Sequence, residues 1–255
     1  MKVSIITVCY NSSSTILNAI LSVNQQNYEN IEHIIVDGLS SDNTLELINS
    51  VPNRVVKIIS EPDNGIYDAM NKGLALCTGD VIGFLNSDDF YASDDVIKLV
   101  ADTFFITGAQ SIFGDLCYVD RLCPDRIIRY WRSGPYAKNS FLLGWAPPHP
   151  TFFVRSEIYK LYGGFDINFR FASDFDLMLN FFEVKNITSS YIPVILVKMR
   201  LGGATNNSFI NIIKQNIEIF KSFRKYNFSF SLLWFILLKI RIRFTQFLRR
   251  DKIIS

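Results

Sequence analysis

Side chains that form disulfides or bind zinc are scarce in this sequence. It has four cysteines and two histidines among 255 residues. Cys117 and Cys123 are spaced C-x5-C, with no second cysteine pair and no histidine nearby. This spacing argues against a structural zinc site. We therefore expect four reduced thiols, as in cytoplasmic proteins.

The sequence also has no excess of one charge, and its amino-terminal stretch does not have the features expected of a leader segment. Its 26 Lys and Arg residues nearly balance its 24 Asp and Glu residues, for a formal charge of +2, so we expect no nucleic-acid partner. The amino-terminal stretch has one lysine and a short apolar run, without the small-residue cleavage site of a signal peptide. We expect it to form the first strand of a cytoplasmic protein.

Glycine is missing from the turn after that first strand, which reads CYNSSS over residues 9–14. Dinucleotide-binding dehydrogenases need a glycine-rich turn at this point, because the backbone must approach the pyrophosphate closely. A nucleotidyltransferase would be expected to have a glycine-rich loop with Lys or Arg here, and NSSST is not one. The turn thus argues against the dehydrogenase, and nucleotidyl transfer is kept as an alternative.

The first hundred residues alternate between strand and helix patterns. Short apolar runs rich in β-branched residues predict buried strands, and apolar residues at helical spacing predict helices. We expect strands at 3–9, 31–38, 55–62 and 80–86, and helices at 11–26, 40–51 and 65–79. This alternation is typical of right-handed βαβ units around a mainly parallel sheet. We predict an α/β, Rossmann-like fold.

Polar and acidic residues follow each of these strands. Asn11 follows the first strand, Asp37 the second, residues 61–64 the third and residues 86–89 the fourth. In parallel sheets, ligands bind beyond the carboxyl ends of the strands. We therefore expect these residues to line one binding edge.

The pattern changes after residue 100. Strands are expected at 111–120, 127–134 and 192–200 in a more antiparallel region, and an apolar helix is expected within 163–184. We place a boundary at about residue 205. Residues 1–205 then form one domain, with halves at 1–100 and 101–205, and residues 206–255 form a helical tail.

The apolar run Val81–Leu85 leads through Asn86 and Ser87 to two adjacent carboxylates, Asp88 and Asp89. A buried charge must be paired or bound to a cation, and carboxylates suit Mg²⁺ or Mn²⁺. Such an ion can bridge the phosphates of a nucleotide-diphosphate donor and neutralise the departing diphosphate. Asp37 would then contact the base or ribose, with Asp63 beside the donor. The alternative is a solvated turn that caps the next helix.

Seven segments, in this order, resemble the bacterial family 2 glycosyltransferases of the GT-A fold: VSIITVCYN, IIVDGLSSDNT, EPDNGIYDAMNKG, GDVIGFLNSDDFY, HPTFFVR, FASDFDLML and MRLGGAT. The resemblance covers about residues 1–205. It implies inverting transfer from a nucleotide sugar, usually UDP-linked, in surface-polysaccharide assembly. It also implies that residues 1–100 bind the nucleotide sugar and residues 101–205 bind the acceptor.

The resemblance assigns roles around the metal. The family's Asp-x-Asp motif falls on Asn86-Ser87-Asp88, which makes Asp88 the direct ligand of Mn²⁺ or Mg²⁺ and Asp89 a neighbouring one. Asn86 replaces the first carboxylate of the motif, and its amide can still hydrogen-bond the ribose. Arg200, after a strand, can contact the diphosphate.

Other matches lie on the donor and acceptor sides. Asn71 and Lys72 fall in a stretch that lines the family's donor site, although Lys72 also has the spacing of a helical ion pair with Asp68. His149, in PPHPTFF, matches an acceptor-side position, with a backbone-bonded loop residue as the alternative. Trp145 is a candidate to stack on an acceptor sugar, with core packing as the alternative.

The resemblance also implies the catalytic base. Inverting transfer needs a carboxylate that accepts the proton of the acceptor hydroxyl. The family's acidic pair falls on Ser173-Asp174, which makes Asp174 this base. The competing interpretation is a nucleotide-sugar-binding protein of the same fold that has no activity.

The tail combines apolar and basic residues. The stretch Leu232–Leu238 is apolar, and Lys239 and Arg241 follow it. It is too short and too charged to span a bilayer, and it fits an interfacial helix on an anionic leaflet. The alternative is a helix docked on the domain. The first interpretation predicts a lipid-linked saccharide acceptor and a peripheral position at the inner face of the cytoplasmic membrane.

Overall fold

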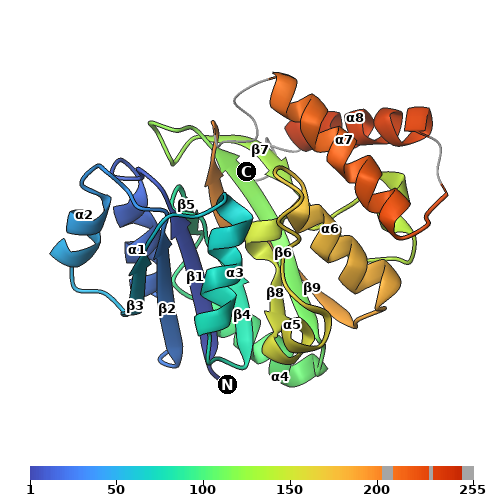
Figure 1. The fold of residues 1–255 in the computed structure, drawn as a ribbon. Helices are drawn as coiled ribbons and strands as arrows, with labels where there is room; N and C mark the ends of the chain where they lie inside the picture. Colours follow the sequence, from blue (N-terminus) through green and yellow to red (C-terminus); the bar gives the residue numbers. More distant parts are fainter. Residues whose placement is uncertain (203–208, 230–231, 249–255) are drawn as a thin grey trace.

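The computed structural model describes residues 1–202, 209–229 and 232–248. Its centre is a nine-stranded mixed sheet of order β3-β2-β1-β4-β8-β6-β9-β5, with β7 paired to β6 beside this path. Helices flank both faces of the sheet (Figure 1). The strands are β1 (Val3–Cys9), β2 (Ile31–Asp37), β3 (Val55–Ser60), β4 (Val81–Phe84), β5 (Asp89–Tyr91), β6 (Ser111–Val119), β7 (Ile127–Trp131), β8 (Phe153–Arg155) and β9 (Ser189–Arg200).

The helices follow the strands in the order that the sequence predicts. They are α1 (Ile16–Asn24), α2 (Thr44–Ser50), α3 (Ile66–Leu76), α4 (Val96–Thr107), α5 (Ser156–Tyr162), α6 (Ser173–Leu179), α7 (Phe209–Lys225) and α8 (Leu232–Leu248). Short helical turns lie at η1 (Ser140–Leu143), η2 (His149–Thr151) and η3 (Asn180–Val184). The predicted strand–helix alternation of residues 1–100 is confirmed.

The first strands form the parallel half of the sheet. β1 pairs in parallel with β2 and β4, and β2 pairs in parallel with β3. In this register Cys9 lies opposite Asp37, which lies opposite Ser60. The carboxyl ends of the three strands therefore finish at the same level and form one edge.

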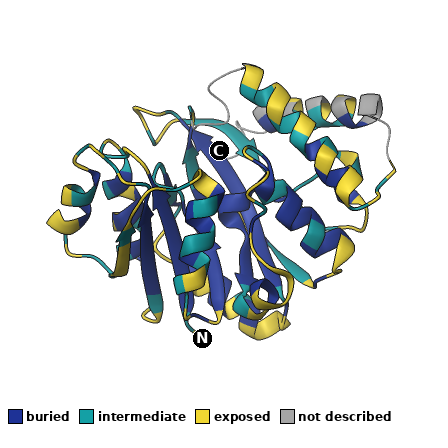
Figure 2. Cartoon of the chain, in the orientation of Figure 1, coloured by how far each residue is buried: buried dark blue, intermediate teal, exposed yellow. Residues whose placement is uncertain are grey.

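Side-chain alternation along β1 divides the interior into two cores. Ile6 and Val8 belong to a core that α3, α5 and α6 cover, whereas Val3 and Ile5 belong to one that α1 and α4 cover. Successive residues of a strand point to opposite faces, so a strand that is apolar at every position must be covered on both sides. The burial colours in Figure 2 show this buried sheet between its helices.

The later half of the sheet is mixed, as expected. β6 pairs antiparallel with β7 and β8 and in parallel with β9. One strand was not expected: β5 begins at Asp89 and pairs antiparallel with β9, with Asp89 opposite Met199. The solvated-turn alternative is therefore wrong for Asp89, which is fully buried. A three-residue strand shows no periodicity in the sequence, and its partner lies far along the chain.

Glu32 links the amino-terminal ends of the parallel strands through hydrogen bonds and an ion pair. Its carboxylate accepts hydrogen bonds from the Thr78 amide (2.6 Å) and the Gly79 amide (2.9 Å), and pairs with Lys2 Nζ at 2.5 Å. Burial would raise the pKa of Glu32, but the bonds from Lys2, Ser4 and Thr78 outweigh it and lower the pKa to about 2. The ionised carboxylate thus stabilises the folded chain.

The tail packs on the domain through α7. Phe223 of α7 contacts Phe175 of α6 and Phe235 of α8, with ring centroids 5.5 and 5.4 Å apart. Lys239 Nζ of α8 donates to Asn216 Oδ1 of α7 at 2.8 Å. No helix among the described residues has the length and apolar character to cross a bilayer. The boundary placed at about residue 205 falls in 203–208, outside the described residues.

Candidate active site

Asp37 ends β2 at the edge where the parallel strands finish. Its side chain is fully buried, and its Oδ2 accepts hydrogen bonds from the Ser60 hydroxyl (2.7 Å) and the Ser40 amide (2.9 Å). The Ser40 hydroxyl also donates to Oδ1. These donors fix a buried carboxylate beside the loop that follows β2.

Two neighbouring loops converge on the same place. Asn11 has a left-handed backbone (φ 47°), and its Oδ1 accepts a hydrogen bond from the Ser41 amide at 2.9 Å. A Cβ atom on Gly38 would lie 2.4 Å from Asp63 Oδ2, so the Asp63 side chain lies directly against this glycine and would have to move if the residue were larger. The structure thus places Asn11 and Asp63 around the loop after Asp37, as the sequence predicts for one binding edge.

The segment after β4 carries the two adjacent carboxylates. Asp89 is fully buried, and its Oδ2 accepts a hydrogen bond from Asn86 Nδ2 at 3.2 Å. The other oxygen of Asp89 and the side-chain oxygen of Asn86 are buried without a hydrogen-bond partner. Burial and the charge of Asp88 hold the pKa of Asp89 well above its usual range. Burial also raises the pKa of Asp88, against the opposing charge of Arg200.

Arg200 lies against this segment from the end of β9. Its Nη1 donates to the backbone oxygen of Asp88 at 2.7 Å, and its guanidinium carbon lies 4.9 Å from the centroid of the Phe90 ring. Only 5% of Arg200 is exposed. The Ser12 and Ser87 hydroxyls, 2.8 Å apart, join this segment to the loop after β1. Arg200 therefore supplies a positive charge beside the Asp88–Asp89 pair.

Asp174 lies in the first turn of α6 with Tyr67 and His149 close by. Its Oδ1 accepts a hydrogen bond from the Tyr67 hydroxyl of α3 at 2.9 Å. Burial and the charge of Asp174 raise the pKa of Tyr67 well above its usual range, so this phenol stays protonated. Burial lowers the pKa of His149 against the charge of Asp174. The His149 ring lies 5.5 Å from that of Phe84, at the end of β4.

The backbone that leads into α6 is held by Glu218 of α7. One Glu218 oxygen accepts the amide hydrogen of Arg170 (3.0 Å), and the other accepts those of Phe171 (2.7 Å) and Ala172 (2.9 Å). These amides lie directly before Ser173 and Asp174, at a helix amino end where backbone donors need partners. Nothing in the local sequence singles out Glu218, because the contact joins separate elements.

Asp176 provides a second link between α6 and α7. Its oxygens accept hydrogen bonds from Ser222 Oγ (2.6 Å), Lys225 Nζ (2.8 Å) and the Tyr226 hydroxyl (3.2 Å). Asp176 is 3% exposed, so its charge is neutralised inside the α6–α7 contact. Of the two acidic residues in this turn, Asp176 is structural and Asp174 faces Tyr67.

Three predicted contact residues are already engaged in the fold. Asn71 makes two hydrogen bonds with the backbone of Phe165, at 2.8 and 2.9 Å. Trp145 donates its indole hydrogen to the Ser133 oxygen at 2.7 Å. Lys72 pairs with Glu61 at 2.8 Å, whereas the expected partner Asp68 lies 3.9 Å away. Their contacts with donor or acceptor stay predictions.

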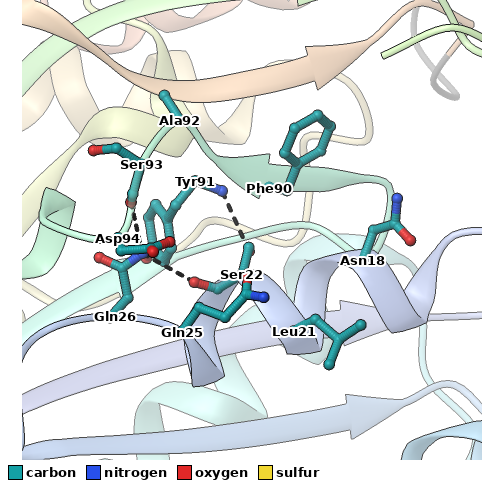
Figure 3. Close-up of a pocket in the computed structure, with 10 residues that line it drawn as sticks. All are labelled: Asn18, Leu21, Ser22, Gln25, Gln26, Phe90, Tyr91, Ala92, Ser93 and Asp94. Carbon is teal, nitrogen blue, oxygen red and sulfur yellow. Dashed lines mark hydrogen bonds between the residues drawn. The ribbon is translucent and has the colours of Figure 1, made fainter. Parts of the chain in front are cut away.

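A separate pocket lies between α1 and the strand β5 (Figure 3). It is lined by Asn18, Leu21, Ser22, Gln25, Gln26, Phe90, Tyr91, Ala92, Ser93 and Asp94. None of the predicted site residues lines it. Gln26 Nε2 donates to the backbone oxygens of Ser22 and Ser93, at 2.9 and 2.8 Å, and so joins two walls of the pocket. The candidate active site is therefore the strand edge and not this pocket.

Solved structures with a similar fold support the assignment of the architecture. The chain superposes on TarS 1–349 of S. aureus in complex with UDP with a TM-score of 0.66, 17% identity, and coverage of 95% of this chain and 70% of that one. It superposes on the mannosyltransferase PcManGT of Pyrobaculum calidifontis, in complex with GDP-Man and Mn²⁺, with a TM-score of 0.67 and 14% identity over 94% and 69% of the two chains.

Sequence comparison gives the family. An uncharacterised glycosyltransferase of Mycobacterium tuberculosis is 33% identical over 182 residues, 69% of this chain and 67% of that protein. A PGL/p-HBAD biosynthesis glycosyltransferase of Mycobacterium bovis is 27% identical over 212 residues, 82% and 80% of the two chains. The model of Glycosyl transferase family 2 matches residues 4–154. The chain belongs to glycosyl transferase family 2 and has the GT-A fold of that family.

Proposed function

We propose that this glycosyltransferase moves a sugar, with inversion, from a nucleotide-diphosphate donor to a hydroxyl of a lipid-linked saccharide. The observation that supports this most directly is that two polar clusters lie near the carboxyl end of β4, where the His149 ring is 5.5 Å from that of Phe84. Asn86, Asp88, Asp89 and Arg200 form the first cluster, and Asp174 with Tyr67 and His149 forms the second. The first cluster has side chains suited to bind a diphosphate with its cation, and the second has side chains suited to remove a proton.

The donor is proposed to lie along the ends of β1, β2 and β4. Asp37, Asn11 and Asp63 surround the loop after β2, where a base and ribose can be hydrogen-bonded. Arg200 would face the diphosphate, since a guanidinium matches phosphate geometry. The neighbours in complex with UDP and with GDP-Man hold nucleotide donors or products on this fold. We infer a UDP-sugar as the donor from the family resemblance.

The residues after β4 fit a divalent cation. Asp88, Asp89 and Asn86 offer hard oxygen ligands, and one buried oxygen each of Asn86 and Asp89 lacks a partner. Among the described residues, no group of three or more His, Cys, Asp or Glu side chains could hold a metal alone. Mg²⁺ is commonly bound by one or two carboxylates together with substrate phosphates. A bound Mn²⁺ or Mg²⁺ supplies positive charge that offsets the charge developing on the leaving diphosphate.

Asp174 is proposed to be the general base. The acceptor oxygen forms a bond to the anomeric carbon while the bond from that carbon to the diphosphate oxygen breaks, and its electron pair leaves with the nucleoside diphosphate. Asp174 takes the proton of the acceptor hydroxyl. The Tyr67 hydroxyl holds one oxygen of Asp174 at 2.9 Å and so fixes its orientation. His149 and Trp145 are proposed to contact the acceptor.

The reaction is proposed to take place at the cytoplasmic face of the inner membrane. The four cysteines are free thiols, including the exposed Cys123, which suits a reducing compartment. A PGL/p-HBAD biosynthesis glycosyltransferase is among the relatives. The free thiols fit the cytoplasmic side, and the relative fits an acceptor carried on a lipid, of the kind used to build O-antigen, capsule or exopolysaccharide. The enzyme itself would bind this surface peripherally.

The test is nucleoside-diphosphate release from a panel of UDP-, GDP- and dTDP-sugars with Mn²⁺ or Mg²⁺, with and without a membrane lipid extract of the host. Asp88→Asn should lose both release and metal-dependent donor binding. Asp174→Asn should lose release but keep donor binding, because it removes only the base. Asp102→Asn, at an exposed position of α4, is the matched control and should behave as the parent protein.

Each alternative predicts a different product. Pyrophosphate in place of nucleoside diphosphate would indicate nucleotidyl transfer. Metal-dependent donor binding without release, even with the lipid extract, would indicate a binding protein without catalysis. The anomeric configuration of the product, read by NMR, tests inversion directly: retention would refute a single displacement with Asp174 as base.

A further inference from the structure

One face of α7 exposes three isoleucines to solvent. Ile210, Ile213 and Ile217 are 61%, 45% and 48% exposed. Their spacing of three and four residues places them on one side of a helix. Figure 2 shows exposed residues along α7. Isoleucine is usually buried, so three on one exposed face require a physical explanation.

The same face is basic. Lys214, Lys221 and Arg224 are exposed and lie between the isoleucines or one turn beyond them. The one acidic residue of α7 is Glu218, which points toward the segment before α6 and binds the backbone of that segment. The exposed face therefore combines apolar and positively charged side chains without an acid.

The described part of α8 repeats this combination. Leu237 and Phe244 are 50% and 64% exposed. Exposed Arg241 lies between them at helical spacing. The two helices pack through other residues, since the Phe220 and Phe235 rings lie 6.0 Å apart. Their contact leaves these faces uncovered.

The face is also fixed in position. On the opposite side, α7 binds the segment before α6 through Glu218 and binds Asp176 through Ser222 and Lys225. A surface presented by an anchored helix does not have to order itself when a partner binds. The helix α7 itself packs against α6, the helix that carries Asp174.

We propose that the exposed face of α7 docks on an anionic phospholipid surface. The isoleucines would enter the boundary between headgroups and acyl chains, and the lysines and arginines would lie against the anionic headgroups. A second copy of the chain suits this face poorly, because two identical basic faces would repel each other. The inference deepens the proposed function, since it gives the surface that brings Asp174 to a lipid-linked acceptor.

The test is sedimentation of the full chain with vesicles of phosphatidylcholine alone and with phosphatidylglycerol added. Binding should require the anionic lipid. It should weaken when salt rises from about 0.1 M to about 1 M, because the screening length falls from about 10 Å to about 3 Å. Ile213→Glu with Ile217→Glu should lower the vesicle partition coefficient by about tenfold or more, through lost apolar burial and added repulsion.

A matched control exists at the other end of the molecule. Phe105 and Ile106 of α4 are 91% and 79% exposed, and Phe105→Glu with Ile106→Glu adds the same charges there. This variant should bind vesicles as the parent does. Lys214→Gln with Lys221→Gln should weaken binding to anionic vesicles only, and circular dichroism confirms that each variant is folded.

Three outcomes would overturn the proposal: no binding to anionic vesicles, equal loss in the α4 control, or a dimer in solution that Ile213→Glu with Ile217→Glu dissolves. The vesicle assay contains no donor or acceptor. Its result is therefore independent of whether the proposed transfer reaction occurs.

Discussion

Replacement of Glu218 should disturb both the stability of the protein and the position of its proposed base. Glu218 accepts three backbone hydrogen bonds of 2.7–3.0 Å from the residues directly before α6. Asp174 lies two residues after the last of them. Glu218→Ala removes all three acceptor contacts, whereas Glu218→Gln keeps the side-chain length and one carbonyl oxygen. The first change should therefore have the larger effect.

The expected size follows from these contacts. A hydrogen bond to a charged group contributes about 1.5–3 kcal/mol, but Glu218 is partly exposed and water can replace some of the contacts. We expect Glu218→Ala to lower the free energy of unfolding by about 2–3 kcal/mol, or Tm by about 5–10 °C in a domain of this size. A shift of the base by about 1 Å should lower kcat about 10- to 100-fold.

The assay separates positioning from general destabilisation. At a temperature where each variant is fully folded, kcat should fall while the KM for the nucleotide sugar stays nearly unchanged, because Glu218 hydrogen-bonds the backbone of residues 170–172 and not the proposed donor-binding residues. Glu218→Gln should restore part of kcat. Glu29→Ala, at an exposed loop position, is the control. A lowered Tm with an unchanged kcat would refute the positioning role and leave Glu218 a structural residue.

Three other changes have distinct expected outcomes. Tyr67→Phe removes the hydrogen bond to Asp174 and should lower kcat about tenfold with little change in donor KM, measured by initial rates. Glu32→Gln should lower the free energy of unfolding by about 3 kcal/mol at neutral pH. Because the folded pKa of Glu32 is depressed from 4.5 to about 2, this difference should be full above pH 4.5 and vanish toward pH 2, in urea melts at each pH. Asp89→Asn should stabilise the metal-free protein by about 1–2 kcal/mol, because it removes a buried charge, and abolish Mn²⁺-dependent donor binding in calorimetry.

The parallel half of the fold could be predicted because each of its elements has a strong local signal. β1 and β2 are buried at nearly every position, and the segments after them have helical spacing. β5 could not be predicted in this way, because its three residues become a strand only through pairing with β9. The same pairing buries Asp89, which the sequence alone left open between a metal ligand and a solvated turn.

The candidate site likewise contains residues that the local sequence indicates and residues that only long-range contacts bring in. Residues such as Asp37 and Asp88 could be proposed as site residues because they lie at or after the ends of strands whose carboxyl ends meet at one edge. Tyr67 and Glu218 were not among the predicted site residues, since their contacts with the α6 segment join parts of the chain that are distant in sequence. Trp145 is a different case. The sequence makes it a candidate to stack on a sugar, but its ring packs among other aromatic rings, with the Phe113 ring centroid at 5.6 Å.

The segment after β4 lowers the stability of the folded protein, and this loss of stability is an argument that the segment binds a ligand. Asp89 is buried beside Asp88 and keeps one oxygen without a hydrogen bond, as does Asn86. Neutral, fully bonded side chains there would make a more stable protein. Asp174, in contrast, is already held by Tyr67. The proposed base is thus already held in the free protein, whereas the proposed Asp88–Asp89 site would be satisfied only by the cation and diphosphate that we propose it binds.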